Sequence, residues 1–150
     1  MSMHNKINAA VIGATGFTGL DLVLMLSKHP KVKITNLCAT KNLGKNINFF
    51  DKRIKKKLPK ISSIKTIDWK NIDLVFLSLP NGAAQKLIKK KFYKYTNLKF
   101  IDLSGDFRIK NPIIYKKNYK THHQAKNLIN YSIYSIPELS GKKINKFRII

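Results

Sequence analysis

Hydrophobic residues along this chain fall into two patterns, short largely apolar runs and segments with helical spacing. Largely apolar runs of strand length cover residues 7–12, 32–39, 73–79 and 100–103. Helical spacing covers residues 17–27, directly after the first run, and residues 83–92, between the last two runs. Strands that are apolar throughout are typical of parallel sheets with both faces covered. The pattern predicts an α/β fold with a Rossmann-like, doubly wound parallel sheet and flanking helices.

The segments between these elements are less informative. His29 and Pro30 follow the first helical segment, and we expect the helix to end there because proline cannot continue it. Residues 41–70 are rich in lysine and weakly patterned, with a possible edge strand or excursion at residues 61–69. The pattern assigns no role to this region.

Three glycines mark the turn from the first predicted strand into the first predicted helix. They form the pattern GxxGxxG, where dinucleotide-binding folds hold a diphosphate. Gly13 would allow the tight turn, Gly16 would let backbone amides approach the diphosphate, and Gly19 would let the helix lie close to the strand. The alternative is a plain glycine-rich turn with Thr18 as the N-cap. The predicted cofactor-binding residues of this turn are Gly13, Thr15, Gly16, Phe17, Thr18 and Gly19.

The end of the second predicted strand indicates which dinucleotide fits. An acidic residue here usually binds the ribose 2′-hydroxyl of NAD, and none is present in the stretch CATKNLGK. Thr40, Lys41 and Lys45 are found instead, and a cation attracts the 2′-phosphate of NADP. The sequence therefore favours NADP, bound in part by Thr40 and Lys41. Because lysine is abundant throughout the chain, any loop would contain some, and NAD stays open as the alternative cofactor.

The strong positive charge has a compositional explanation. The formal net charge is +23, which suggests a polyanionic partner. The basic residues are 27 Lys and only 3 Arg, beside 20 Ile and 14 Asn, all of which except Arg have AT-rich codons. Recognition of bases and phosphates favours the bidentate guanidinium of Arg. We therefore predict no nucleic-acid partner, although a basic nucleic-acid-binding module stays open as an alternative.

The single cysteine indicates a reducing compartment. Cys38 cannot form an internal disulfide, and no apolar run reaches the roughly 18 residues needed to span a bilayer. We expect a cytoplasmic protein with no membrane partner. Cys38 lies at the end of the second strand with no base beside it in the sequence, so we expect a buried structural thiol and not a nucleophile.

The histidines and tyrosines of the last third carry weaker signals. His122 and His123 are adjacent and have no Cys or carboxylate cluster, so we predict no metal site and expect them at the surface or the substrate mouth. Four tyrosines are expected to pack under loops and not to stack on bases, because their spacing is irregular: Tyr115, Tyr119, Tyr131 and Tyr134.

Four blocks of sequence carry a family resemblance. In order, they are GATGFTGLDLVLMLSKHP, DLVFLSLPNG, IDLSGDFRI and YSIPEL. Together they resemble the N-terminal, NAD(P)-binding half of the N-acetyl-gamma-glutamyl-phosphate reductases, in the semialdehyde dehydrogenase superfamily. The resemblance runs from about Lys6 to Ile150. The pair HP and the triplet DFR separate this family from the related aspartate-semialdehyde dehydrogenases.

The resemblance implies an oxidoreductase of arginine biosynthesis. Such enzymes use NADPH to reduce an acyl phosphate to an aldehyde through a thioester on cysteine. Their cysteine lies in a segment like NPGCYPT, directly after a strand like residues 146–150, and their catalytic histidine lies in a later substrate and dimerisation domain. We therefore expect residues 1–150 to be the cofactor-binding domain, without catalytic residues and inactive alone, and the full-length protein to be a homo-oligomer. Alternatives are a related acyl-phosphate reductase of lysine biosynthesis, an aspartate-semialdehyde dehydrogenase-like enzyme and a non-catalytic nucleotide-binding module.

Further site residues follow from the resemblance and from their place after predicted strands. The loops after the third and fourth strands are expected beside the cofactor, through Leu79, Pro80, Asn81, Gly82 and Ser104. Asn81 stands where the family commonly has His. Arg108 is expected to bind the acyl phosphate, with a surface contact to Asp106 as the alternative.

The block YSIPEL adds a second substrate-binding candidate. Glu138 is the only glutamate of the chain and corresponds to the family's PEL glutamate, near the catalytic centre. Ser135 replaces the family's usual Gly, so this position could require a different backbone conformation.

Overall fold

The structure is a computed structural model that describes residues 6–150. The chain divides into two compact units, the first ending at Ser78 and the second comprising Leu79–Ile150. Each unit is described by itself.

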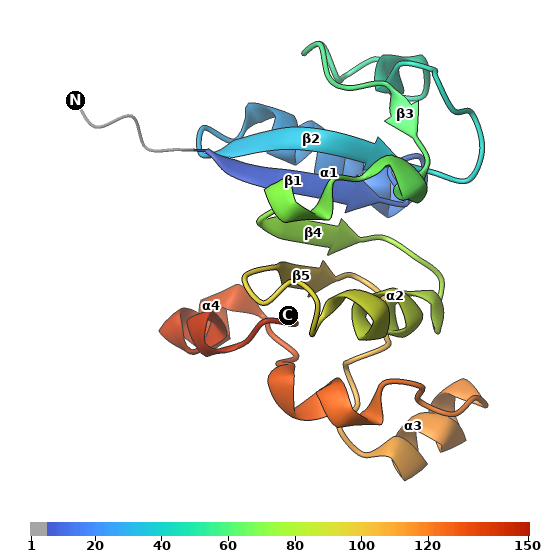
Figure 1. Cartoon of the computed structure of the whole chain (residues 1–150), viewed down its shortest axis with the longest axis vertical. Helices are drawn as coiled ribbons and strands as arrows, with labels where there is room; N and C mark the ends of the chain where they lie inside the picture. The colour runs from blue at the N-terminus through green and yellow to red at the C-terminus, as the bar shows by residue number, and fades with distance from the viewer. Residues whose placement is uncertain (1–5) are drawn as a thin grey trace. The chain divides into compact units, whose positions relative to one another are not determined.

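The first unit is built on a parallel sheet (Figure 1). Its strands are β1 (Ile7–Ile12), β2 (Val32–Cys38), β3 (Ile61–Ser62) and β4 (Leu74–Leu77). Their order is β3-β2-β1-β4, and the neighbouring strands pair in parallel. The chain leaves β1 toward β2 and later returns to its other side, so the carboxyl end of β1 is a topological switch point. Ligands of open α/β folds bind at such points.

Helix α1 (Phe17–Lys28) connects β1 to β2 and forms as its apolar spacing predicts. Val23 is fully buried and Leu22 and Leu26 are 8 % exposed, whereas Met25 on the other side is 63 % exposed. The helix ends at His29, whose amide donates to the Leu26 carbonyl oxygen at 3.1 Å. The predicted end before Pro30 is confirmed.

Residues 41–70 form short turns with little regular structure. They contain the 3-10 helices η1 (Ile47–Phe49) and η2 (Ile64–Thr66), and η3 (Trp69–Asn71) follows. Of the possible edge strand predicted at residues 61–69, only the two residues of β3 form a strand. The Ser63 and Asp68 side chains accept hydrogen bonds from the Lys65 and Lys70 amides, and these caps start 3-10 turns where a longer strand would have continued.

The second unit contains one strand and several short helices (Figure 1). They are α2 (Ala83–Lys91), β5 (Lys99–Asp102), α3 (Pro112–Tyr119), η4 (Lys126–Tyr131), α4 (Pro137–Ser140) and η5 (Gly141–Lys146). Residues 148–150 run parallel to β5, with the Asp102 amide donating to the Ile150 carbonyl oxygen at 2.7 Å. Phe100 and Ile149 pair there and are fully buried.

The predicted elements agree closely with these bounds. The strands expected at residues 73–79 and 100–103 are β4 and β5, and the helix expected at residues 83–92 is α2. The predicted α/β, Rossmann-like class with parallel strands and flanking helices is confirmed. Within residues 6–150, no helix combines the length and the apolar character that crossing a bilayer requires.

Candidate functional site

The glycine turn lies at the carboxyl end of β1, and two of its glycines are required by the fold. The Gly13 and Ala14 amides donate to the Cys38 carbonyl oxygen at 2.9 and 3.1 Å. Gly13 has φ +86°, and a Cβ there would lie 2.0 Å from the Ser78 carbonyl oxygen. A Cβ on Gly19 would lie 2.1 Å from the Gly13 carbonyl oxygen. Both positions exclude side chains because backbone already occupies the space.

Gly16 is different, because nothing inside the protein requires a glycine there. Its φ of −77° and ψ of 165° are accessible to any residue. A Cβ on Gly16 would make one ordinary contact, 3.6 Å from the Gly13 carbonyl oxygen. The missing side chain keeps the solvent-facing side of the turn open. This is the arrangement expected where backbone must approach a ligand closely.

The start of α1 offers its amides to this open side. The N-cap is Gly16, so the alternative with Thr18 as N-cap is wrong, and α1 has neither a side-chain cap nor an acidic residue in its first turn. Phe17 is 95 % exposed and Thr18 is exposed beside it, whereas Thr15 is half-buried. Uncapped amides and the helix dipole together favour an anion at such a helix start.

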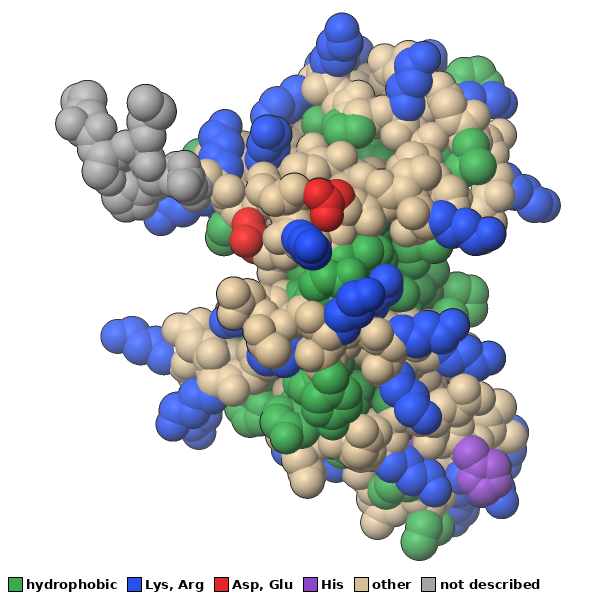
Figure 2. Space-filling model, in the orientation of Figure 1, with side chains coloured by type: hydrophobic (Ala, Val, Ile, Leu, Met, Phe, Trp, Pro, Cys, Tyr) green, Lys and Arg blue, Asp and Glu red, His purple; other side chains and the backbone are tan. Residues whose placement is uncertain are grey.

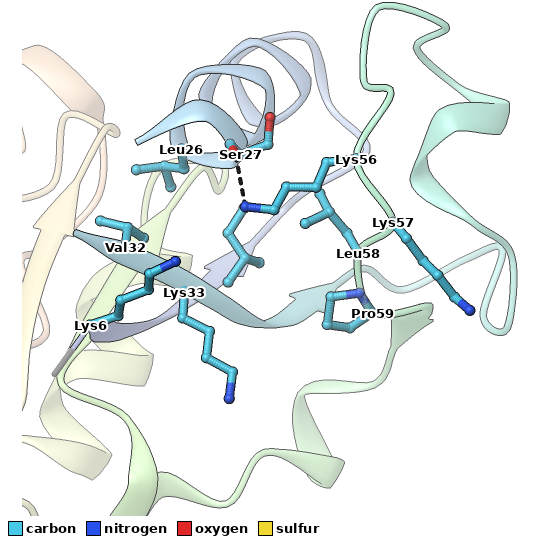
Figure 3. Close-up of a pocket in the computed structure, with 10 residues that line it drawn as sticks. Lys6, Leu26, Ser27, Val32, Lys33, Lys56, Lys57, Leu58 and Pro59 are labelled. Atoms are coloured by element: carbon cyan, nitrogen blue, oxygen red, sulfur yellow. Dashed lines mark hydrogen bonds between the residues drawn. The ribbon is translucent and has the colours of Figure 1, made fainter. Parts of the chain in front are cut away.

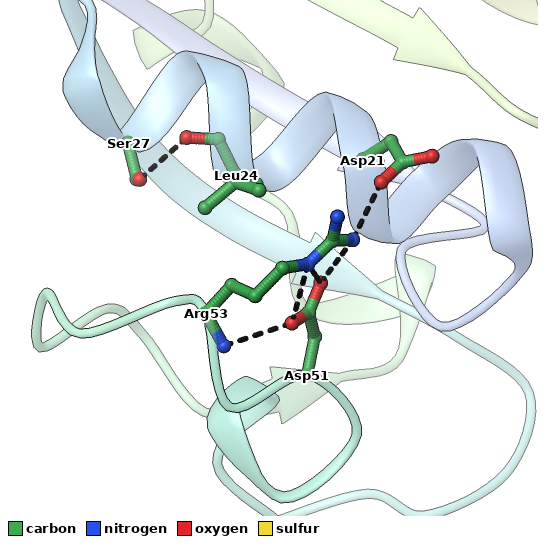
Figure 4. Close-up of polar contacts among 5 residues, drawn as sticks. All are labelled: Asp21, Leu24, Ser27, Asp51 and Arg53. Atoms are coloured by element: carbon green, nitrogen blue, oxygen red, sulfur yellow. Dashed lines mark hydrogen bonds and ion pairs between the residues drawn. The ribbon is translucent and has the colours of Figure 1, made fainter.

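Two acidic residues of the first unit, Asp21 and Asp51, are paired with Arg53. Figure 4 shows Arg53 reaching from the loop after β2 to Asp21 on α1, with Asp51 below it. Its Nη2 lies 2.6 Å from Asp21 Oδ1 and 2.7 Å from Asp51 Oδ2. Hydrogen bonds from Arg53 lower the pKa of Asp51. Thr40 and Lys41, at the end of β2, are exposed and have no carboxylate next to them in the sequence.

In the second unit, two loops are tied together by side-chain hydrogen bonds. The Asn81 side-chain oxygen accepts from the Gly105 amide at 3.2 Å. Asp106 accepts from the Gly82 amide at 2.7 Å and from the Gln85 amide at 3.1 Å, so it caps the start of α2 from the other loop. The Ser104 hydroxyl accepts from the Asp106 amide at 3.2 Å. The loop of Leu79, Pro80, Asn81 and Gly82 is thereby held beside the loop that begins at Ser104.

Asp106 is fully buried and is the centre of a polar network that the sequence did not reveal. It also accepts a hydrogen bond from the Tyr115 hydroxyl at 3.0 Å. Burial raises the pKa of Tyr115 to about 12. The proposed surface contact between Asp106 and Arg108 is therefore wrong, because the Asp106 carboxylate faces inward toward these donors.

His123 belongs to the same network. Its Nε2 lies 2.9 Å from the Asp106 carbonyl oxygen, and its Nδ1 accepts from the Ala125 amide at 3.1 Å. It is 2 % exposed, so the expectation of a surface or substrate-mouth residue is wrong for His123, whereas His122 is exposed. Burial lowers the pKa of His123, which favours the neutral ring that these two bonds require.

The tyrosines divide into packed and exposed pairs. Tyr115 is fully buried and Tyr119 half-buried, with ring centroids 4.7 Å apart, as packing under a loop predicts. Tyr131 and Tyr134 are 49 % and 59 % exposed, so the expectation that they pack under loops is wrong for about half of their surface. Both exposed rings have one neighbour: the Tyr131 ring centroid lies 5.1 Å from that of Phe92, and the Arg108 guanidinium lies over the Tyr134 ring.

Two of the three arginines are committed to the fold, and Arg108 is not. Arg53 makes the ion pairs of Figure 4. Arg148 donates to the carbonyl oxygens of Phe92, Leu98 and Tyr95 and lies over the Phe92 ring. Among residues 6–150, every ion pair involves Arg53. Arg108 therefore has no carboxylate partner in this part of the chain, and its guanidinium lies 5.4 Å from the Tyr134 ring centroid.

Arg108 lines a pocket of about 430 Å³ in the second unit. Its walls are largely apolar, and its polar lining consists of Asp102, Ser104, Arg108, Tyr134 and Ser135. Glu138 is exposed in the first turn of α4 and is not part of this lining, although its neighbour Pro137 is. Ser135 does not adopt the left-handed conformation, so replacement of the family's glycine is sterically acceptable there.

Asp102 is a site residue that sequence reasoning missed. It ends β5, and its Oδ1 accepts from the Ser104 amide at 3.0 Å. Burial raises the pKa of Asp102 to about 6. The available signal was a carboxylate near the carboxyl end of a largely apolar predicted strand, where side chains of parallel sheets reach the ligand edge.

A second pocket, of about 500 Å³, lies at the start of β2 and the end of α1 (Figure 3). Lys6, Lys33, Lys56 and Lys57 line it, and the Lys56 ammonium donates to the Ser27 carbonyl oxygen at 3.1 Å. All four lysines are exposed. Figure 2 shows lysines dispersed over the visible face, as a compositional excess of lysine would place them. This pocket contains no buried polar group that needs a ligand, so it is not the candidate site.

Cys38 is buried, and the prediction of a structural thiol is confirmed. Its Sγ lies 3.9 Å from the Ser62 hydroxyl oxygen, and burial raises the pKa of the thiol. A raised pKa is the opposite of what a nucleophile needs. Across residues 6–150, no three His, Cys, Asp or Glu side chains lie together as metal ligands.

Comparison with known proteins identifies the family of this chain. Residues 8–147 match the family described as semialdehyde dehydrogenase, NAD binding domain. A relative from Ehrlichia canis, named N-acetyl-gamma-glutamyl-phosphate reductase, is 41% identical over 99% of this chain and 42% of its own length. A probable chloroplastic enzyme of the same name from Arabidopsis thaliana is 34% identical over 98% of this chain and 36% of its own length. The chain thus spans about two fifths of such relatives.

Solved structures agree on the fold. Aspartate semialdehyde dehydrogenase II from Vibrio cholerae has a TM-score of 0.65 at 17% identity, over 97% of this chain and 37% of its own. Aspartate semialdehyde dehydrogenase with NADP from Candida albicans has a TM-score of 0.52 at 23% identity, over 72% of this chain and 32% of its own. The chain belongs to the semialdehyde dehydrogenase family, in which it matches the NAD-binding domain.

Proposed function

We propose that this chain is the cofactor-binding part of an enzyme that uses NADPH to reduce N-acetyl-gamma-glutamyl phosphate to the semialdehyde. The observation that carries the proposal is Gly16, a glycine that the protein's own packing does not require. The names of relatives that are 34–41% identical over nearly the whole chain support the substrate.

The residues of the glycine turn fit a dinucleotide. A diphosphate on the open side of Gly16 would meet the first amides of α1 and the exposed Thr18 hydroxyl. Gly13 and Gly19 allow the strand and helix to approach closely enough to form that surface. When bound, the nicotinamide supplies hydride, and this part of the chain has the task of holding and orienting the dinucleotide.

Lys41 supports NADP over NAD. In the stretch after β2 no carboxylate is present to bind a ribose 2′-hydroxyl, and Asp51 and Asp21 are held by Arg53. An exposed ammonium at position 41 would attract a 2′-phosphate and would contribute little to binding NADH.

Lys41→Glu is expected to weaken NADPH binding about tenfold to a hundredfold, because repulsion replaces an attraction worth about 1.4–2.7 kcal/mol. NADH affinity should change less than about threefold. Titration followed by nicotinamide fluorescence measures both. Lys52→Glu, which makes the same charge change elsewhere on the first unit, is the control. Equal losses for NADPH and NADH would contradict a 2′-phosphate contact at Lys41.

The substrate is tested on the protein that contains this chain. NADPH oxidation should depend on N-acetyl-gamma-glutamyl phosphate and proceed more slowly with the homologous acyl phosphate of lysine biosynthesis or with aspartyl phosphate. A higher kcat/KM for either of these would assign the protein to the other substrate. NADPH binding without reduction of any of the three would indicate a non-catalytic nucleotide-binding protein.

A further inference from the structure

Two residues that line one pocket each have a buried side-chain oxygen without a hydrogen-bond partner. Among residues 6–150, Asp102 Oδ2 and Ser135 Oγ are the buried side-chain polar atoms left unsatisfied. Both residues line the 430 Å³ pocket of the second unit. Buried polar atoms are nearly always hydrogen-bonded, so two exceptions in one pocket indicate a ligand that supplies the missing partners.

The two oxygens require different partners. Asp102 Oδ1 already accepts from the Ser104 amide, which fixes the carboxyl group and leaves Oδ2 as a hydrogen-bond acceptor when ionised. The Ser135 hydroxyl can donate to a carbonyl oxygen. The ligand therefore needs an N–H or O–H donor and an acceptor.

The third polar group of the pocket requires an anion. Arg108 has no carboxylate partner among the described residues, and its guanidinium presents donors suited to a carboxylate or phosphate. Ile101, Phe107 and Ile133 provide apolar wall, which suits a short aliphatic chain or a methyl group. An anion, an N–H donor, a carbonyl acceptor and a small apolar part occur together in an N-acylated amino acid.

We propose that this pocket binds the acylamino group of the substrate, with Asp102 Oδ2 accepting its N–H and Ser135 Oγ donating to its acyl carbonyl oxygen. Arg108 binds an anionic group of the same molecule. The inference rests on the proposed function and adds to it the residues that distinguish an acylated amino group.

The burial of Asp102 can be checked independently through the pH dependence of the protein's stability. The raised pKa of about 6 means that the folded protein binds this proton more tightly than an unfolded chain with the ordinary value of 3.8. Stability should therefore fall as the pH rises from about 4 to about 6, and the cost persists above that range. The charged groups acting on Asp102 are Asp106, which raises its pKa, and Arg108, which lowers it.

The test compares two ligands that differ only in the proposed donor. N-acetyl-L-glutamate has the amide N–H, and 2-acetoxyglutarate has an ester oxygen in its place. Binding to the chain is followed by the amide signals of pocket residues in NMR. We expect the wild-type chain to bind N-acetyl-L-glutamate about tenfold more tightly, because the ester leaves Asp102 Oδ2 unpaired.

Asp102→Asn should remove this preference and raise the melting temperature at pH 7 by about 2–4 °C, since its amide replaces an unfavourably buried carboxylate. Ser135→Ala should weaken both ligands about equally, because both have the acyl carbonyl. The controls are Asp68→Asn, an exposed cap, and Ser132→Ala, a buried serine that donates to the Ile129 carbonyl oxygen. Neither control should change the ligand preference.

These measurements test ligand binding in the pocket independently of the reductase reaction. A preference for the N–H that disappears in Asp102→Asn supports the inference even if the reductase assay selects another acyl phosphate. Equal binding of both ligands to the wild-type chain, or an unchanged preference in Asp102→Asn, overturns it whatever the reductase assay shows. A lower melting temperature in Asp102→Asn would also count against it, because Oδ2 would then have a partner within the protein.

Discussion

Replacement of Gly16 by Val is expected to weaken NADPH binding by at least about a hundredfold, a loss of about 2.7 kcal/mol. The branched side chain would fill the open side of the turn and hold the diphosphate away from the first amides of α1. The backbone at Gly16 is extended, and a Cβ there would have its nearest neighbour 3.6 Å away, so the folded chain accommodates the substitution. Valine is a poorer N-cap than glycine, which should cost about 1 kcal/mol or less.

Titration by nicotinamide fluorescence measures the affinity, and circular dichroism checks the fold. Gly16→Ala should give an intermediate loss because it adds a single methyl group. Met25→Val on the exposed side of α1 is the matched control, with unchanged NADPH affinity expected. Wild-type affinity in a folded Gly16→Val chain would place the dinucleotide elsewhere and remove the main support for the proposed function.

Replacement of Asp106 by Ala is expected to lower the free energy of unfolding by about 3–5 kcal/mol. The carboxylate is fully buried and accepts hydrogen bonds from Gly82, Gln85 and Tyr115. Truncation would leave these three donors buried without their acceptor and would uncap the start of α2. A domain's total stability is only about 5–15 kcal/mol, so a loss of this size is severe.

Urea unfolding followed by circular dichroism measures the change, and hydrogen exchange at the Gly82 and Gln85 amides localises it. Asp68→Ala is the control: Asp68 accepts from the Lys70 amide and the Asn71 side chain but is exposed, so its loss should cost less than about 1 kcal/mol. A similar, small cost for both substitutions would mean that water replaces the Asp106 carboxylate.

The contrast between these two residues shows how stability and binding are divided in this chain. Asp106 has a full set of partners, so it serves the fold and keeps the loops that follow β4 and β5 in place within the second unit. Asp102, four residues earlier, lines a pocket and has a buried carboxylate oxygen without a hydrogen-bond partner. Natural proteins keep such unfavourable groups where function requires them.

The sequence by itself determined the elements and the family. Six elements were predictable because the spacing of apolar residues within each segment is typical of its structure: β1, β2, β4, β5, α1 and α2. Such spacing can be recognised from neighbouring residues alone. The glycine turn was equally visible, since its spacing follows directly on a predicted strand. Residues 41–70 were not predictable, because short turns and a two-residue strand depend on caps and contacts with little periodicity.

Only the tertiary structure decided which residue does what at the site. The glycine pattern predicted different roles for Gly13, Gly16 and Gly19, but only the surrounding backbone shows that, of these three, Gly16 alone has room for a side chain. The family resemblance singled out Arg108, but only the structure shows that Arg53 and Arg148 are held by partners within the fold. Asp106 and His123 are held in the interior by hydrogen bonds to residues many positions away in the sequence. Whether the side-chain oxygens of Asp102 and Ser135 find partners also depends on the folded structure. Such bonds form where the folded chain brings groups together, and no local pattern records them.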